Sequence, residues 1–180
     1  RGRGDGEISR VGFPPYTQYG VKENPFGDGD VVSCAEDWLE KVSEDEPFCM
    51  YVGTLGPHDP YFVPEEYLDL YPDESMELPV SWTDRMLDKP NLYRRPRERF
   101  DQLDETEQKR SLKHYLAFCS YEDALFGRLL DVLERRNLLE NTVVLYVSDH
   151  GDYAGAHGLW TKGLPCFKEA YHICSVMGYG

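Results

Sequence analysis

Two short apolar runs constrain the fold most, because each one ends in a loop of ionisable residues. The first run covers residues 48–52 and the second covers residues 142–147. Nearly continuous apolar segments of this length are typical of strands that are covered on both faces. A helical pattern precedes each run, so the order helix, strand, loop, helix, strand predicts an α/β fold with a largely parallel sheet flanked by helices.

The helical patterns differ in clarity. Apolar residues recur at helical spacing over 32–42, and Ser33 is a plausible N-cap for that helix. A longer apolar stripe covers residues 112–133. Asp104 stands three residues before a glutamate, which approximates a capping box, and Asn137 suits the position just beyond the end of the helix. This second helix is the best-defined element of the sequence.

Two segments lack a periodic pattern. Residues 1–30 are rich in glycine, proline and aspartate, which predicts irregular loop. Residues 61–100 contain five prolines and predict a long excursion with at most short helices, and such loops in a compact domain are usually functional or disordered. The excursion ends in a basic cluster, which we interpret as a solvated face paired with acids, with docking of a polyanion as the alternative. The cluster consists of Arg94, Arg95, Arg97 and Arg99.

Composition excludes several classes of protein. A length of 180 residues suits one domain. The chain has 19 Lys plus Arg and 33 Asp plus Glu, and the resulting net charge of −14 argues against a nucleic-acid partner. No apolar run approaches the roughly 20 residues that a membrane span needs. The five cysteines are odd in number and form no C-x-x-C pair, so a zinc ribbon and a dense disulfide scaffold are excluded.

The loop after the second apolar run holds the strongest candidates for a site. Asp149 and His150 provide a carboxylate and an imidazole side by side, which suits a divalent cation, and the alternative is a capping aspartate next to a hydrogen-bonded histidine. His157 and Lys162 follow in a glycine-rich stretch that would suit an anion beside a cation. Lys162 taken by itself is better interpreted as a solvated surface amine.

The loop after the first run contains His58 between Pro57 and Pro60, which stiffen it. A positioned histidine can protonate a leaving oxygen or bind an anion, although a structural role is the alternative. Ligands of open α/β sheets bind at the carboxyl ends of the strands. If the two strands are parallel neighbours, the two loops therefore meet at one crevice.

Four passages of the sequence resemble the type I sulfatases, in the order that this family has them. They include P-H-D-P-Y after the first apolar run, S-D-H-G-D after the second, and G-A-H-G-L-W-T-K-G after that. The fourth is the long helical pattern before the second run. Together they cover roughly residues 45–177 and place the chain in the alkaline-phosphatase superfamily.

The resemblance implies a role for each candidate residue. Asp149 and His150 would be two ligands of one divalent cation, which is calcium in most sulfatases. Lys162 would hold the sulfate oxygens, His58 would contact the sulfate group and protonate the leaving oxygen, and His157 would line the pocket. The implied reaction is hydrolysis of a sulfate ester by a formylglycine, which the family makes from the motif C/S-x-P-S/A-R.

That motif is absent from these 180 residues, as are the paired aspartates and the Lys-x-His passage of the family. Cys174 also stands where the family usually has proline. We therefore interpret residues 1–180 as the central part of a single, incomplete sulfatase catalytic domain, inactive as an isolated segment. A central piece of this kind would expose strand edges that are normally covered.

Alternatives remain open at this stage. A phosphodiesterase or phosphonate monoester hydrolase of the same superfamily fits the same residues, and so does a non-catalytic sulfatase-like binding module. For a sulfatase, the expected partner is a sulfated small molecule or carbohydrate, selected by residues 61–100. The sequence leaves the oligomeric state and the compartment open, while the family makes a periplasmic, lysosomal or secreted protein plausible.

Overall fold

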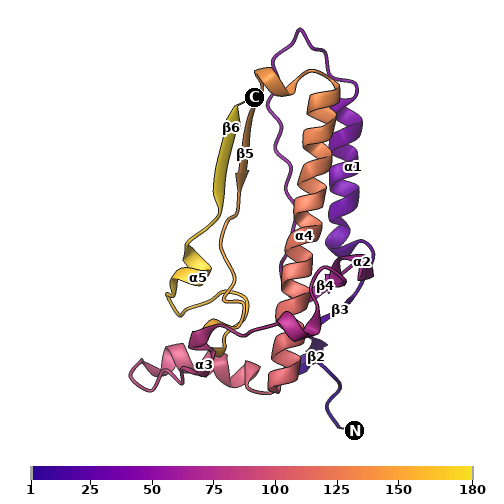
Figure 1. Cartoon of the computed structure of the whole chain (residues 1–180). Helices are drawn as coiled ribbons and strands as arrows, with labels where there is room; N and C mark the ends of the chain where they lie inside the picture. The colour runs from indigo at the N-terminus through magenta and orange to yellow at the C-terminus, as the bar shows by residue number, and fades with distance from the viewer. Residues whose placement is uncertain (1, 180) are drawn as a thin grey trace.

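A 31-residue helix, α4, is the longest element of the structure, and much of the chain packs around it (Figure 1). The structure is a computed structural model that describes residues 2–179. Its helices are α1 (Asp28–Leu39), α2 (Glu65–Leu68), α3 (Asn91–Phe100), α4 (Glu105–Arg135) and α5 (Lys168–Tyr171). Its strands are β1 (Glu7–Arg10), β2 (Phe13–Thr17), β3 (Tyr19–Val21), β4 (Tyr61–Val63), β5 (Val143–Val147) and β6 (Ser175–Tyr179).

Both ends of α4 agree with the sequence prediction. The Asp104 carboxylate accepts a hydrogen bond from the backbone N–H of Glu107 at 2.9 Å, and the Glu107 carboxylate accepts one from the N–H of Asp104 at 2.8 Å. This reciprocal pair satisfies N–H groups that the first turn of a helix leaves without partners. Asn137 follows the helix with φ +54°, the left-handed conformation that ends many helices. The capping box and the stop signal are therefore confirmed.

Buried apolar clusters follow α4 along its length and attach the neighbouring elements to it. Representative members, from the N-terminal to the C-terminal end of the helix, are Tyr61, Phe100 and Leu112; Val32, Val63 and Phe118; and Leu39, Val132 and Leu138. Removing such side chains from water is the main favourable contribution to folding. The clusters hold α1 and the β3–β4 pair against the helix, so α4 is the framework on which the loops are mounted.

The strands form three separate two-stranded sheets. The pairs β1–β2 and β5–β6 are antiparallel, and only β3–β4 is parallel among the described residues. The β3–β4 pair is parallel because α1 lies between its strands in sequence and serves as the crossover that a parallel pair requires. The α/β class is thus as predicted, but residues 2–179 do not form a largely parallel sheet.

The first apolar run does not form the predicted strand. In residues 48–52, Phe48 and Met50 pack against the cluster shared by α1 and α4, whereas Tyr51 is 91% exposed. No strand within residues 2–179 pairs with this segment. Its apolar pattern therefore reflects packing on one side, without the strand partners that would complete a sheet.

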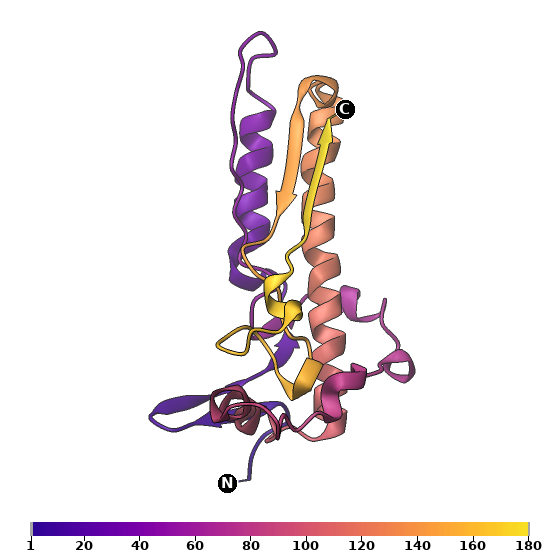
Figure 2. The ribbon, with the colours of Figure 1, turned by 90° about the vertical axis from the view of Figure 1, so that its left-hand side faces the viewer.

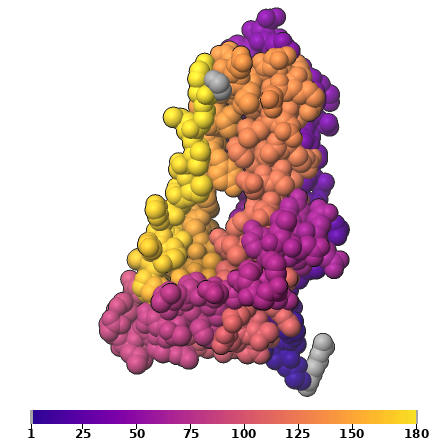
Figure 3. Space-filling view, in the orientation of Figure 1, coloured from indigo at the N-terminus to yellow at the C-terminus, as the bar shows by residue number. Residues whose placement is uncertain are grey.

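The second apolar run forms β5 as predicted, yet β5 is not covered. Val143 and Leu145 are each 60% exposed, and β6 is exposed along its whole length. The β5–β6 pair stands away from the helices over part of its length (Figures 1 and 3), and the view in Figure 2 looks onto this pair. The apolar residues of both strands therefore present surface that the rest of the described chain does not bury.

The first 30 residues are more regular than predicted, since they contain three short strands and the start of α1. Helix α1 begins at Asp28 with Gly27 as its N-cap, so Ser33 is not the cap. The Ser33 hydroxyl instead donates to the carbonyl of Gly29 inside the helix at 2.9 Å. The two prolines of β2 are tolerated because β2 has one unpaired edge and its register with β1 is irregular between Ile8 and Arg10, opposite the prolines.

Candidate active site

The two predicted loops meet, and His58 and Lys162 are in direct contact. The Lys162 Nζ lies 2.5 Å from the His58 Nε2. The His58 Nδ1 lies 2.6 Å from the carbonyl oxygen of Asp59 and 3.1 Å from its carboxylate. Because both partners of Nδ1 are acceptors, the proton of a neutral imidazole belongs on Nδ1, and Nε2 accepts from the ammonium. The loops of both residues are exposed at this point.

His150 and Asp149 lie at the edge of the same site. The ring centroids of His58 and His150 are 6.5 Å apart. The His150 Nδ1 donates to the carbonyl of Gly151 at 2.8 Å, which leaves Nε2 with a free lone pair 3.7 Å from the Asp149 carboxylate. A backbone acceptor on one ring nitrogen is the arrangement that orients a metal-binding histidine.

These two side chains fit part of a cation site. A carboxylate oxygen and an imidazole nitrogen 3.7 Å apart can face one divalent cation, and the Asp149 side chain is 87% exposed and so accessible. Within residues 2–179, no group of three or more His, Cys, Asp or Glu side chains could hold a metal ion. Asp149 and His150 are therefore suited to supply two ligands and not a complete shell.

Gly151 keeps this loop close to the C-terminal segment. Its N–H donates to the carbonyl of Ala170 at 2.9 Å. A Cβ at position 151 would lie 2.1 Å from the carbonyl oxygen of Glu169, so any other residue would push the two segments apart. Close backbone approach, rather than a left-handed turn, is the physical reason for glycine after His150.

His157 is held apart from this cluster by its own partners. Its Nδ1 lies 2.8 Å from the Asp84 carboxylate, and its ring stacks on Phe167 with centroids 3.8 Å apart. The N–H of Met86 and the contact with His157 lower the pKa of Asp84. These contacts tie His157 to the 61–100 excursion, and none of them joins it to His58 or Lys162.

The interpretation of the basic cluster as a solvated face is wrong for Arg97, whereas Arg95 is exposed. This residue of α3 is 5% exposed, and its guanidinium donates to three carbonyl oxygens at 2.7–2.9 Å. The acceptors belong to Trp82, Asp84 and His157. Gly158 has φ +65°, and a Cβ there would lie 2.1 Å from the Arg97 guanidinium. Arg97 thus anchors the excursion to the turn that carries His157.

Two carboxylates support the site and were not singled out from the sequence, namely half-buried Asp152 and buried Asp28. Asp152 accepts hydrogen bonds from the Tyr61 hydroxyl and from two backbone N–H groups. Asp28, which is 1% exposed, accepts from the N–H groups of Leu55 and Gly56 at 2.9 Å each, just before His58. The bond from residue 154 to Asp152 is an Asx-turn, a local signal that the sequence does contain.

Of the five cysteines, Cys119 is unsuited to act as a nucleophile in the described structure. Cys119, on α4, is the only one that is not exposed, and burial raises the pKa of its thiol to about 11. A thiol with so high a pKa is almost fully protonated near neutral pH and reacts poorly as a nucleophile.

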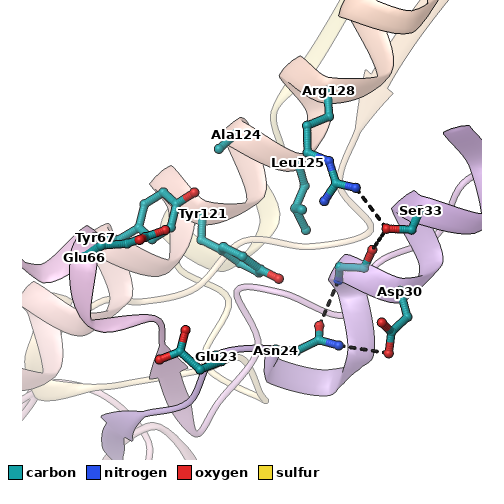
Figure 4. Close-up of a pocket in the computed structure, with 11 residues that line it drawn as sticks. Glu23, Asn24, Asp30, Ser33, Glu66, Tyr67, Tyr121, Ala124, Leu125 and Arg128 are labelled. Carbon is teal, nitrogen blue, oxygen red and sulfur yellow. Dashed lines mark hydrogen bonds between the residues drawn. The ribbon is translucent and has the colours of Figure 1, made fainter.

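A cavity of about 360 Å³ lies elsewhere, between the start of α1 and the middle of α4 (Figure 4). Its lining includes Asn24, Ser33 and Tyr121, together with Arg128, which pairs with Glu36. Because the charge of Arg128 is already neutralised, this cavity offers less to an anion than the contact between His58 and Lys162.

Comparisons with known proteins identify the family to which the chain belongs. The family model for Sulfatase matches residues 13–174. The chain is 35% identical to the choline-sulfatase of Rhizobium meliloti (strain 1021) over 135 residues, which cover 69% of the chain and 26% of that protein. It is 30% identical to human iduronate 2-sulfatase over 190 residues, which cover 94% of the chain and 33% of that protein.

Solved structures show the same fold. The structure of BT4656 in complex with its substrate D-glucosamine-2-N,6-O-disulfate superposes with a TM-score of 0.69 at 18% identity, covering 84% of this chain and 42% of that one. The phosphonate monoester hydrolase of Agrobacterium radiobacter gives a TM-score of 0.69 at 20% identity, covering 81% and 31%.

The comparisons match this chain to part of the length of each relative. The chain spans about a quarter to a third of the length of the curated relatives that it matches. Within residues 2–179, none of the helices is long and apolar enough to cross a membrane. The family model covers nearly the whole sequence, and the chain belongs to the sulfatase family.

Proposed function

We propose that the protein hydrolyses sulfate esters and that this chain supplies the half of the active site that binds the sulfate group. The contact between His58 and Lys162, which are 104 residues apart in sequence, is the observation that carries the proposal. An anionic oxygen placed beside this pair would accept from the Lys162 ammonium. It would also accept from the His58 Nε2 once that nitrogen carries a proton.

His58 would deliver a proton to the leaving oxygen. Asp59 accepts from Nδ1 and so directs Nε2 toward the site, where proton transfer to a leaving alkoxide would take place. Lys162 would stabilise the sulfate oxygens throughout the reaction, because its charge lies beside them without further reorganisation. His157 would line the pocket from the side of the excursion.

Asp149 and His150 would hold a divalent cation, for which the family points to calcium. When bound, this cation would stabilise negative charge on the sulfate group. The remaining ligands and the formylglycine nucleophile would come from a segment outside these 180 residues, since no cysteine lies in the motif C/S-x-P-S/A-R. In this proposal residues 1–180 are the central part of one catalytic domain and are inactive alone.

The substrate class follows from the relatives. Human iduronate 2-sulfatase and choline-sulfatase are relatives whose names identify sulfated compounds, and BT4656 binds a disulfated glucosamine. We propose a sulfated carbohydrate or small molecule as the substrate here. Residues 61–100 would contact it, because this excursion is fastened beside the site by Arg97 and Asp84.

Removing the Lys162 ammonium tests the proposal. In the full-length protein assayed with an aryl sulfate, Lys162→Ala should raise KM at least about tenfold, with a smaller change in kcat, because a charge-assisted contact to the sulfate group is lost. Lys168→Ala, which removes an exposed lysine six residues away, is the matched control and should leave both constants unchanged. Unchanged KM and kcat for Lys162→Ala would contradict the assigned role.

Removing a proposed metal ligand provides a second test. Asp149→Ala should abolish activity and weaken Ca²⁺ binding by at least about tenfold in titration calorimetry. Even the loss of a residue that only hydrogen-bonds to a metal ligand typically weakens metal binding by about 10–100-fold. Asp131→Ala, an exposed aspartate on α4, is the matched control. Full turnover of Asp149→Ala at saturating calcium would show that Asp149 is not a ligand.

Phosphonate hydrolysis is the second candidate, because the phosphonate monoester hydrolase superposes on this chain as well as BT4656 does. Parallel assays of the full-length protein with an aryl sulfate and an aryl phosphonate separate the two. A clear preference for the phosphonate would replace the first proposal. Absence of turnover with either ester would favour a non-catalytic binding module.

A further inference from the structure

Three segments that carry the proposed site residues converge on one carboxylate, that of Asp152. Its Oδ2 accepts from the Tyr61 hydroxyl at 2.7 Å, and Tyr61 follows His58 by three residues. Its Oδ1 accepts from the N–H of Thr161, the residue just before Lys162, at 2.9 Å. Asp152 itself follows His150 by two residues.

The same carboxylate bonds to backbone that is held in an unfavourable conformation. Ala154 has φ +46° and Thr161 has φ +63°, and both donate their N–H groups to the Asp152 Oδ1. A β-branched residue such as threonine rarely adopts positive φ, because its side chain crowds the backbone there. Such conformations persist only where surrounding bonds hold them, and they are concentrated at functional sites.

The far end of this connection is rigid. Tyr61 is fully buried, and its ring packs against Trp160 and Tyr115 with centroids 5.7 and 5.4 Å apart. The indole of Trp160 donates to Gln108 of α4 at 2.5 Å. The hydroxyl of Tyr61 therefore presents a fixed donor to Asp152. Through Asp152 and the packed ring of Tyr61, the position of the Lys162 loop is fixed relative to α4.

We infer that Asp152 is a positioning residue, which holds Lys162 against His58 by fastening the strained turn at Thr161 to the buried hydroxyl of Tyr61. It does not touch the substrate in this arrangement. Its effect on an anion passes through the ammonium of Lys162, which it holds against the imidazole of His58. The inference rests on the proposed function, because it assigns that pair to the binding of a sulfate group.

The test measures anion affinity and turnover in the full-length protein. Tyr61→Phe keeps the buried ring and removes only the hydroxyl, so it is preferred to Asp152→Ala, which leaves three donors without an acceptor and endangers folding. Titration calorimetry with inorganic sulfate, and separately with inorganic phosphate, should show about tenfold weaker binding for Tyr61→Phe. With an aryl sulfate, KM should rise by up to about tenfold with a smaller change in kcat, because Tyr61→Phe acts through the same ammonium that Lys162→Ala removes.

Two comparisons separate positioning from general weakening of the fold. Tyr115→Phe removes a hydroxyl from the same aromatic cluster without touching Asp152, and it should change neither affinity nor kcat. In a Lys162→Ala background, Tyr61→Phe should cause no further loss of affinity, since the group that it positions is already gone. An equal loss in both backgrounds, or an equal loss for Tyr115→Phe, would overturn the inference.

The remaining outcomes are also distinct. If the wild-type protein binds sulfate or phosphate but cleaves no sulfate ester, the proposed function fails, and the affinities of the variants still decide the role of Asp152. If Tyr61→Phe binds the anion as tightly as wild type, the inference is wrong whatever the protein cleaves. A wild-type protein that binds neither anion overturns the inference together with the anion site.

Discussion

At the residue scale, two carboxyl groups share a buried contact beneath the loop that carries His58. Glu122 of α4 is 5% exposed and Asp28 is 1% exposed. Burial, and to a lesser degree the charge of Asp28, raises the pKa of Glu122 to about 7. A Cβ at Gly56 would lie 2.1 Å from the Glu122 carboxylate, so the loop backbone rests directly on it.

Glu122 should make stability fall with rising pH. The folded pKa is about 7 against an ordinary value of 4.5, so between these values the folded state holds a proton that the unfolded state has released. This contribution is complete below about pH 4.5 and is lost as the pH rises through 7. Glutamine is neutral at every pH, so Glu122→Gln should have a higher free energy of unfolding than wild type above pH 7. The expected difference is a few kcal/mol, because each unit of pKa shift corresponds to about 1.4 kcal/mol.

Urea unfolding at several pH values between 4 and 8 measures this effect. Glu134→Gln, which changes an exposed glutamate of the same helix, serves as the matched control and should keep the pH dependence of wild type. Since His114 is present in all three proteins, its own titration cancels in the differences. Parallel curves for wild type and Glu122→Gln would show that the buried proton is absent.

At the scale of the element, α4 depends on its capping box. Asp104→Ala removes the side-chain acceptor of the Glu107 N–H and should lower the free energy of unfolding by about 1 kcal/mol. Glu105→Ala, one residue later, loses only an exposed ion pair with Lys109 and should cost less than about 0.5 kcal/mol. The two variants are compared by their denaturant midpoints, provided that the m-value is unchanged. Equal losses of unfolding free energy would mean that the cap contributes nothing.

At the scale of the whole molecule, the antiparallel β5–β6 pair leaves apolar side chains exposed to solvent. Val176 and Met177 are 60% and 73% exposed, and Leu145 of β5 is 60% exposed. An exposed apolar strand with a free edge is a template for pairing with another chain. The 180-residue chain produced by itself should therefore self-associate through this pair of strands.

Sedimentation at increasing concentration tests this expectation. Val176→Lys should shift the chain toward the monomer, because a charge on the strand opposes burial against a second copy. Val11→Lys is the matched control, since Val11 is fully exposed at the distant β1–β2 turn and should not alter association. A wild-type chain that stays monomeric at all concentrations would show that the exposed strands do not associate.

Part of this molecule could be predicted from the sequence, because some of its structure is decided by neighbours along the chain. The limits of α4 follow from Asp104 and Asn137, which act on backbone groups within a few residues. The family followed largely from motifs of five to nine residues, and these motifs contain His58, Asp149, His150 and Lys162. Local residues therefore determine where helices end and which chemical groups each loop carries.

Tertiary structure decided the rest, because it depends on contacts between residues far apart in sequence. Residues 48–52 have the pattern of a buried strand, yet a strand exists only where a partner offers its backbone groups. Arg97 belongs to a cluster of charges, and only the fold brings three carbonyl oxygens to it. The contact of Lys162 with His58 likewise requires Asp152 to bridge loops about 90 residues apart, and such placement is a property of packing that no local pattern encodes.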